Sequence, residues 1–189
     1  MKTLITVFLL FFSSSVFSKD IFDYEIDGLR VGDTLLTNFS ENEIINALNY
    51  DHLPSSMKFR IIELEPKSNS IFDSLQFFYK PDDKNYIIHH IFGAIFYKSN
   101  VNKCYEKLFI ESKKLSNLFS TSSLLGPEKI THPDDNSGKS TITSYYLETQ
   151  DGLIGVQCYE FSDNVPWTNN FRISIGTRET HNWMENNYF

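Results

Sequence analysis

The chain has 189 residues, of which 41% are hydrophobic and 22% are charged, a composition that excludes a disordered chain and a multi-span membrane protein. With 17 basic and 24 acidic residues the net charge is −7, which argues against nucleic acid and anionic lipid as partners. Phenylalanine (17) and tyrosine (10) are abundant while alanine is scarce, so aromatic side chains fill core positions and their number alone does not indicate a binding surface.

Residues 1–18 have the pattern of a secretory signal peptide. A lysine follows the first methionine, residues 3–12 are apolar, and a segment of small residues ends at Ser18. An uncleaved membrane anchor is the alternative, but an anchor needs about 20 consecutive apolar residues and three serines interrupt this run. We predict cleavage after Ser18 and a single mature domain at 19–189, periplasmic or secreted, without a lipid anchor because no cysteine lies at the cleavage site.

Short elements are expected at the start of the mature chain. Residues 21–26 alternate apolar and mostly charged side chains, as in a short strand that enters a turn. A first short helix is predicted at 34–38. The capping box formed by Ser40 and Glu43 predicts a second helix at 41–49.

Three strands rich in Phe, Ile and Tyr are predicted next, at 57–64, 71–80 and 84–98. The last two flank the turn-forming residues 81–83 and so form a hairpin. The third strand is apolar on both faces, which indicates a central position in a sheet, and Gly93 is expected to mark a bend or a bulge.

The second half of the chain begins with its longest predicted helix. Apolar residues recur with a period near 3.6 over 101–119. A polar loop is predicted at 120–139 because Gly and Pro interrupt it. Three further strands are predicted at 140–148, 152–161 and 170–177, the last of them half-exposed.

These elements predict an α+β fold in which the helices pack on one face of an antiparallel β-sheet. Each half, 19–99 and 100–178, reads as a helical part followed by three strands, which suggests a pseudo-repeat. Two unrelated hairpins of similar composition are the alternative. The aromatic tail at 179–189 either docks on the sheet as a short helix or binds a partner.

Cys104 and Cys158 are the only cysteines, and in an oxidising compartment two cysteines can form one intramolecular bridge. Cys104 lies on the apolar stripe of the long predicted helix and Cys158 on the apolar face of a predicted strand. Both thiols should therefore point into the layer between helix and sheet. We predict a disulfide with its Cα atoms about 4.4 to 6.8 Å apart, two buried free thiols being the alternative.

Two patterns share residues with known binding loops but lack the required context. Residues 138–141 match the end of a phosphate-binding loop, yet Pro133 holds the earlier glycine position. Asp134 and Asn136 are spaced like the opening of a calcium loop, yet Tyr145 stands where a bidentate glutamate is needed. We expect neither a cofactor nor a metal.

Histidines could supply a catalytic base, but none of the five has the spacing of a catalytic triad or a metal site: His52, His89, His90, His132 and His181. His89 and His90 are adjacent in a predicted strand, so their side chains are expected on opposite faces of the sheet, one packed in the core and the other exposed.

Several segments carry a resemblance to known proteins. Residues 24–36 (YEIDGLRVGDTLL) and 39–44, with 103–107 (KCYEK) and 132–140, resemble small exported proteins of AT-rich marine bacteria, a family without a known activity. The helix pair followed by a three-stranded meander is similar to small lipoproteins of the outer-membrane-assembly machinery and to β-lactamase-inhibitor-like folds, although the lipidated cysteine is missing here. The resemblance implies an envelope binding protein and assigns no site residue.

From these observations we expect an exported, non-enzymatic binding protein of the cell envelope, with another envelope protein as the partner to be sought. The alternative is a small hydrolase or a small-ligand-binding protein that uses an aromatic-lined cleft with His90 or His132. A carboxylate within hydrogen-bond reach of either histidine in a concave site would favour this alternative.

Overall fold

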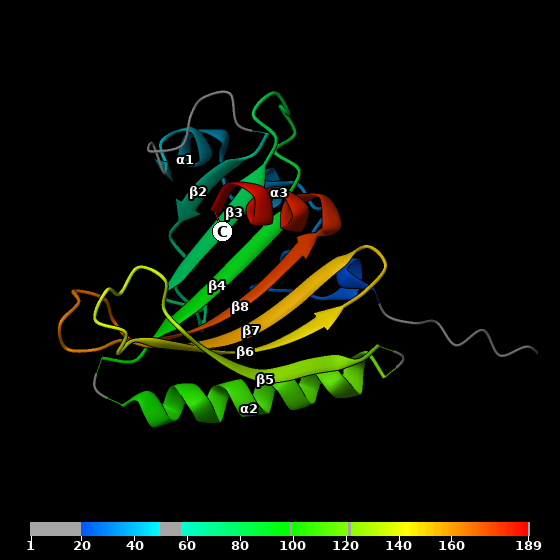
Figure 1. Ribbon diagram of the computed structural model, residues 1–189. Coiled ribbons are helices and arrows are strands. Elements are labelled where there is room, and N and C mark those ends of the chain that lie inside the picture. Colours follow the sequence, from blue (N-terminus) through cyan, green and yellow to red (C-terminus); the bar gives the residue numbers. More distant parts are fainter. Residues whose placement is uncertain (1–19, 50–57, 99, 121, 189) are drawn as a thin grey trace, which may run out of the picture.

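The computed structural model of the chain describes residues 20–49, 58–98, 100–120 and 122–188 (Figure 1). The predicted signal peptide at 1–18 lies outside the described residues. Within the described ranges, no helix combines the length and the apolar character needed to cross a membrane.

One antiparallel sheet of eight strands forms the centre of the protein. The strand order is β1-β2-β3-β4-β8-β7-β6-β5, so two consecutive meanders meet at their last strands, β4 and β8 (Figure 1). The strands are β1 (Leu48–Asn49), β2 (Arg60–Leu64), β3 (Ser74–Tyr79), β4 (His90–Phe96), β5 (Leu124–Thr131), β6 (Thr141–Glu148), β7 (Gly152–Glu160) and β8 (Asn170–Thr177).

The described helices are few and mostly short, and together with the sheet they confirm the predicted α+β class. Only α2 is long, and its 18 residues match the helix expected at 101–119. The helices are η1 (Ile21–Asp23), η2 (Leu35–Thr37), α1 (Glu41–Ile45), α2 (Val101–Leu118) and α3 (Arg178–Tyr188).

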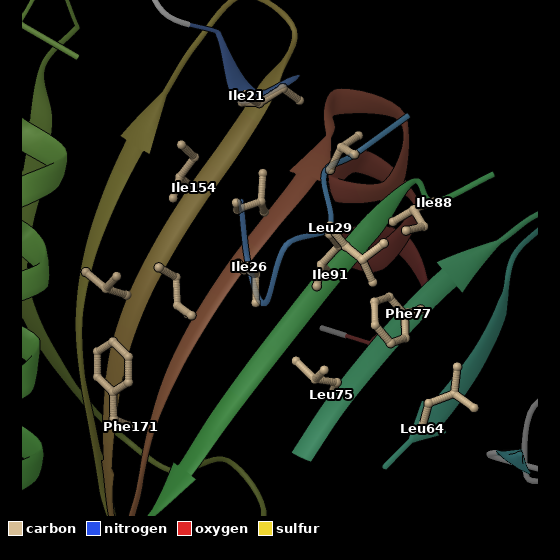
Figure 2. Close-up of a cluster of buried hydrophobic side chains, with 14 of the residues drawn as sticks. Ile21, Ile26, Leu29, Leu64, Leu75, Phe77, Ile88, Ile91, Ile154 and Phe171 are labelled. Atoms are coloured by element: carbon tan, nitrogen blue, oxygen red, sulfur yellow. The ribbon is translucent and has the colours of Figure 1, made fainter. Parts of the chain in front are cut away.

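The main hydrophobic core lies on one face of the sheet, which we call the core face. Figure 2 shows Ile26 and Leu29 of the N-terminal segment lying over strand residues such as Ile91 and Ile154. All four side chains are fully buried. Because each buried side chain of this size contributes about 1.5 to 3 kcal/mol, this layer is the main source of stability.

Helix α2 packs on the core face beside the N-terminal segment, and a disulfide fixes it there. The bond joins Cys104 of α2 to Cys158 of β7, and the two Cα atoms are 5.7 Å apart. Both cysteines are fully buried. The predicted pairing and its location between helix and sheet are confirmed.

The C-terminal helix α3 docks on the sheet, which is one of the two alternatives predicted for the aromatic tail. The helices were expected on a single face of the sheet, but α3 lies on the face opposite the main core. Trp183 packs edge-on against Phe59 and Phe78, with ring centroids 5.5 and 6.1 Å apart. Phe78 is in the strand position next to Phe77, which faces the main core, so alternation places Phe78 on the other face. We call this the α3 face.

The segment predicted as a polar loop at 120–139 contains the edge strand β5, so that prediction was wrong. Gly126 and Pro127 interrupt a strand pattern in the sequence, but an outermost strand tolerates proline because no further strand needs a backbone N–H at that position. The register with β6 shifts between Leu125 and Glu128 to accommodate them.

Three local predictions are also corrected. The second helix ends at Ile45 because Asn46 caps it, and β1 follows. The strand expected at 84–98 begins only at His90. Gly93 pairs regularly with Leu75 and causes no bulge, and a Cβ there would lie 2.6 Å from the ring of Phe72, so close packing explains the glycine.

The strand β8 was expected to be half-exposed and is instead central. It pairs with β4 on one side and β7 on the other, and Phe171, Ile173 and Ile175 are buried on the core face. Its opposite residues, Arg172 and Ser174, lie on the α3 face.

Candidate functional site

Four aromatic rings form a continuous cluster on the α3 face, beyond the part that α3 covers. We call the cluster of His132, Tyr159, Phe161 and Trp167 the aromatic strip. The ring of His132 lies 5.1 Å from Trp167, 5.2 Å from Phe161 and 5.9 Å from Tyr159, measured between centroids. Trp167 is 42% exposed, so one end of the strip is open to solvent.

The sheet and two neighbouring loops position the strip. Tyr159 belongs to β7 and points away from its neighbour Cys158, which faces the core. Phe161 follows the end of β7, and Trp167 lies in the loop 161–169 that leads to β8. His132 begins the loop 132–140 between β5 and β6. Figure 1 shows these two loops at the same end of the sheet.

The carboxylate of Asp135 ties these two loops together. It accepts hydrogen bonds from the backbone N–H of Ser137 at 2.9 Å and of Ser140 at 2.8 Å, and from the hydroxyl of Ser162 at 3.3 Å. The N–H of Ser162 donates in turn to the hydroxyl oxygen of Ser140 at 3.0 Å. The strip therefore rests on loops that are cross-linked before any ligand arrives.

The same hydrogen bonds give a structural role to the loop 132–140, whose sequence shares features with phosphate-binding and calcium-binding loops. Hydrogen bonds from Ser140 and Ser137 hold the pKa of Asp135 well below its usual range, so this carboxylate stays ionised at neutral pH. Ser140 is fully buried. Among the described residues no group of three or more His, Cys, Asp or Glu side chains could hold a metal.

Arg172 of β8 extends the strip toward the centre of the sheet. Its guanidinium carbon lies 4.3 Å above the ring of Tyr159, and its Nε donates to the side-chain oxygen of Asn170 at 2.9 Å. Arg30 and Arg178 each pair with a glutamate. No carboxylate of the described residues lies within ion-pair distance of the half-buried Arg172.

A layer of neutral polar groups lies beside Arg172. Gln157 donates to the hydroxyl oxygens of Tyr146 at 2.8 Å and Ser144 at 3.2 Å, and accepts from the hydroxyl of Tyr159 at 3.3 Å. Burial raises the pKa of Tyr159, so its hydroxyl remains a neutral donor. The groups around the guanidinium thus offer hydrogen bonds without negative charge.

The prediction that His89 and His90 lie on opposite faces of the sheet was wrong. The strand begins at His90, so alternation does not apply to His89. The ring of His89 packs against Phe59, and His90 lies against Phe78, so both approach the side covered by α3. The two rings also lie near successive residues of α3, Glu179 and Thr180.

His90 is buried in the core, which confirms that one of the two histidines is a packed core residue. Its ring stacks on Phe92 at 4.3 Å between centroids, and its Nδ1 is 3.3 Å from the hydroxyl of Thr180. Burial lowers the pKa of His90 to about 3. Its Nε2 has no hydrogen-bond partner in the described structure. His90 is therefore sealed beneath α3 rather than placed in a cleft.

His132 lies among aromatic rings, but without the carboxylate contact that the alternative function requires. Its Nδ1 accepts the backbone N–H of Asp134 at 3.2 Å. Burial lowers the pKa of His132, which favours the neutral ring. The ring of His132 therefore contributes to the strip through its contacts with the other three rings.

A separate groove of about 530 Å³ lies at the other edge of the sheet, between α1 and β2. Four carboxylates line this groove, and three of them accept hydrogen bonds from other groups of the protein. Glu43 caps α1 through Ser40, Glu63 accepts the hydroxyl of Ser74, and Asp73 accepts the N–H of Phe96. The fourth is Glu65.

The sequence did not single out Tyr159, Phe161, Trp167 or Arg172 as site residues. A signal was present, because three of the four rings of the strip fall within nine residues, at the end of one predicted strand and in the loop before the next. No family model, curated protein or solved structure matches the chain, so the interpretation of the site depends on its geometry.

Proposed function

We propose that the chain is an exported, non-enzymatic binding protein of the cell envelope that contacts a partner protein through the aromatic strip. The observation that carries the proposal is a pre-organised set of rings with an open end at Trp167, on a part of the α3 face that α3 itself does not cover (Figure 1). Aromatic residues and arginine are the side chains most enriched at the centres of protein interfaces.

Rigid loops support binding through this surface. The bonds around Asp135 hold both loops that carry the strip, so little conformational entropy is lost when a partner arrives. His132, Tyr159 and Phe161 are half-buried within the strip, which fixes their rings and leaves Trp167 as the most accessible contact.

The disulfide supports export. Disulfides between fully buried cysteines form and persist in oxidising compartments such as the periplasm, and are rare in the cytosol. The apolar leader at 1–18 agrees with this compartment.

Binding is favoured over catalysis by the state of the two histidines named as bases. His90 is packed between aromatic rings with a pKa of about 3, and His132 uses Nδ1 to accept a backbone N–H. A general base needs to reach a substrate proton with its free nitrogen, which the packing of His90 prevents.

Site-specific photo-crosslinking in cells of the native host tests the proposal. A photoreactive amino acid replaces Trp167 in one variant and Asn117 in a matched control, since Asn117 is exposed on the outer surface of α2. We expect a discrete crosslinked envelope protein from position 167 and none from position 117. Equal crosslinking at both positions, or none at position 167, would overturn the proposal.

A further inference from the structure

We infer that Arg172 recognises a carboxylate: the aromatic strip binds an acidic segment of the partner protein, in which an Asp or Glu side chain pairs with Arg172 and an adjacent apolar residue packs on the strip. This inference deepens the proposed function and rests on it.

The charge of Arg172 is not balanced by a carboxylate of the described residues. The chain has seven more acidic than basic residues, and Arg30, Arg178, Lys107 and Lys129 all have a glutamate within 4.0 Å. Arg60 and Arg172 have none among the described residues, and of these two arginines Arg60 is exposed and Arg172 is half-buried. A partly desolvated cation without a counter-ion in an acidic protein is suited to receive one from a partner.

The guanidinium of Arg172 is held in a defined orientation. Stacking on the ring of Tyr159 and the hydrogen bond from Nε to Asn170 restrict the orientation of the guanidinium plane. The terminal nitrogens are the part of the fork that can receive a carboxylate in a two-point contact. The neighbouring Gln157 is already bonded to Ser144, Tyr146 and Tyr159, so it does not compete as an acceptor.

The cation and the open apolar end are linked by ring contacts. Tyr159 touches both Arg172 and His132, and His132 touches Trp167, so a cationic end and an open apolar end belong to one continuous surface. A segment that places an acidic side chain beside an aromatic residue matches both ends. The side-chain carboxylate is preferred to a chain terminus because it can reach a half-buried guanidinium while the backbone stays above the strip.

Matched dipeptides test the inference by NMR on ¹⁵N-labelled, disulfide-bonded protein. Acetyl-Glu-Phe-amide and acetyl-Gln-Phe-amide have the same shape and differ only in the carboxylate. We expect the Glu peptide to shift the amide signals of residues 132, 157–161 and 167–174 and to bind at least about fivefold more tightly than the Gln peptide, as for a charge-assisted hydrogen bond. Equal affinity of the two peptides would overturn the inference without any variant being needed.

Variants then assign the effect to Arg172. Arg172→Gln should abolish the preference for the Glu peptide, and Arg172→Lys should retain only part of it because lysine lacks the planar fork. Arg60→Gln is the matched control, since Arg60 is an exposed arginine at the start of β2. A preference that survives Arg172→Gln, or disappears in Arg60→Gln, contradicts the assignment.

Two further outcomes separate this inference from the proposed function. N-acetylphenylalanine, which presents a terminal carboxylate, should bind more weakly than the Glu peptide, and tighter binding would refute the choice of an acidic side chain. In cells, Arg172→Gln should reduce crosslinking from position 167 at least about threefold, as expected for loss of an ion pair. Unchanged crosslinking refutes the inference while the binding function stands, whereas no crosslinking in the parent protein refutes the function itself.

Discussion

A Cβ atom on Gly176 would lie 2.1 Å from Nδ1 of His90, so the buried imidazole occupies the space that any other residue at position 176 would need. The two residues are direct neighbours on β8 and β4. His90 in turn contacts Thr180 of α3, so the absence of a side chain at position 176 lets the histidine ring fit between the sheet and the helix.

Gly176→Ala should therefore destabilise the protein by about 1 to 3 kcal/mol, the usual range for overpacking a buried site. The free energy of unfolding from urea denaturation measures the effect. His90→Ala removes the obstacle, so Gly176→Ala should cost clearly less in that background. An equal cost in both backgrounds would show that the imidazole is not responsible.

The disulfide should contribute about 4 kcal/mol on the chain-entropy model for a loop of this length. The two cysteines are 54 positions apart and fully buried, so a reductant can reach the bond only when the structure opens. Cys104→Ala/Cys158→Ala should lower the urea midpoint accordingly. In the parent protein, thiol labelling after reductant treatment should be slow without urea and fast with it, and rapid labelling in the absence of urea would contradict this burial.

Glu111 on α2 should make stability depend on pH. Burial raises the pKa of Glu111, but hydrogen bonds from Lys114 and Lys107 outweigh it and the net shift is downward from 4.5. A carboxylate with a lowered pKa in the folded state contributes stability above its unfolded pKa and loses it as the pH falls through the folded value.

The comparison of the parent protein with Glu111→Gln between pH 7 and pH 3 isolates this group from the other carboxylates. The difference in unfolding free energy between the two proteins should be constant above about pH 5.5 and should shrink as the pH falls below the unfolded value of about 4.5. A difference that does not change over this range would mean that Glu111 titrates alike in both states.

Asp135→Ala should loosen the loops of the aromatic strip while the sheet remains folded. The amides of Ser140 and Ser162 are hydrogen-bonded in the network around this carboxylate, so their hydrogen exchange should speed up by about tenfold or more, as expected for local opening. Asp134→Ala is the control because Asp134 is an exposed neighbour. Amides of the central strands should keep their protection in both variants.

The sequence predicted those elements whose side-chain pattern is local. The period of 3.6 identified α2 almost to the residue, and alternation located β6, β7 and β8. The disulfide followed from the same two patterns, because the apolar faces of Cys104 and Cys158 could meet in only one layer. The same alternation also predicted a strand at 21–26, where the structure has the short helix η1, so the pattern was reliable only for the longer elements.

The remaining features depend on contacts between distant segments. The edge strand β5 was missed because Gly126 and Pro127 interrupt its pattern, and pairing with β6 overrides that local signal. The aromatic strip is formed by side chains from two loops and one strand. The side-chain pattern within any one of these segments gives no information about its contacts with the other two. The side of the sheet chosen by α3 depends on Phe59 and Phe78, far from it in the sequence.

The position of β8 has a consequence for how the chain reaches its native state. Of the described strands it is the last to be synthesised, yet it lies between β4 and β7 and joins the two meanders. The edge of β4 in the first meander therefore stays unpaired until residues 170–177 have been synthesised. Because the pairing of β4 with β8 joins residues far apart in the sequence, we expect it to form late and slowly. A chain truncated before β8 should consequently expose that edge and aggregate, whereas a chain that contains β8 covers it.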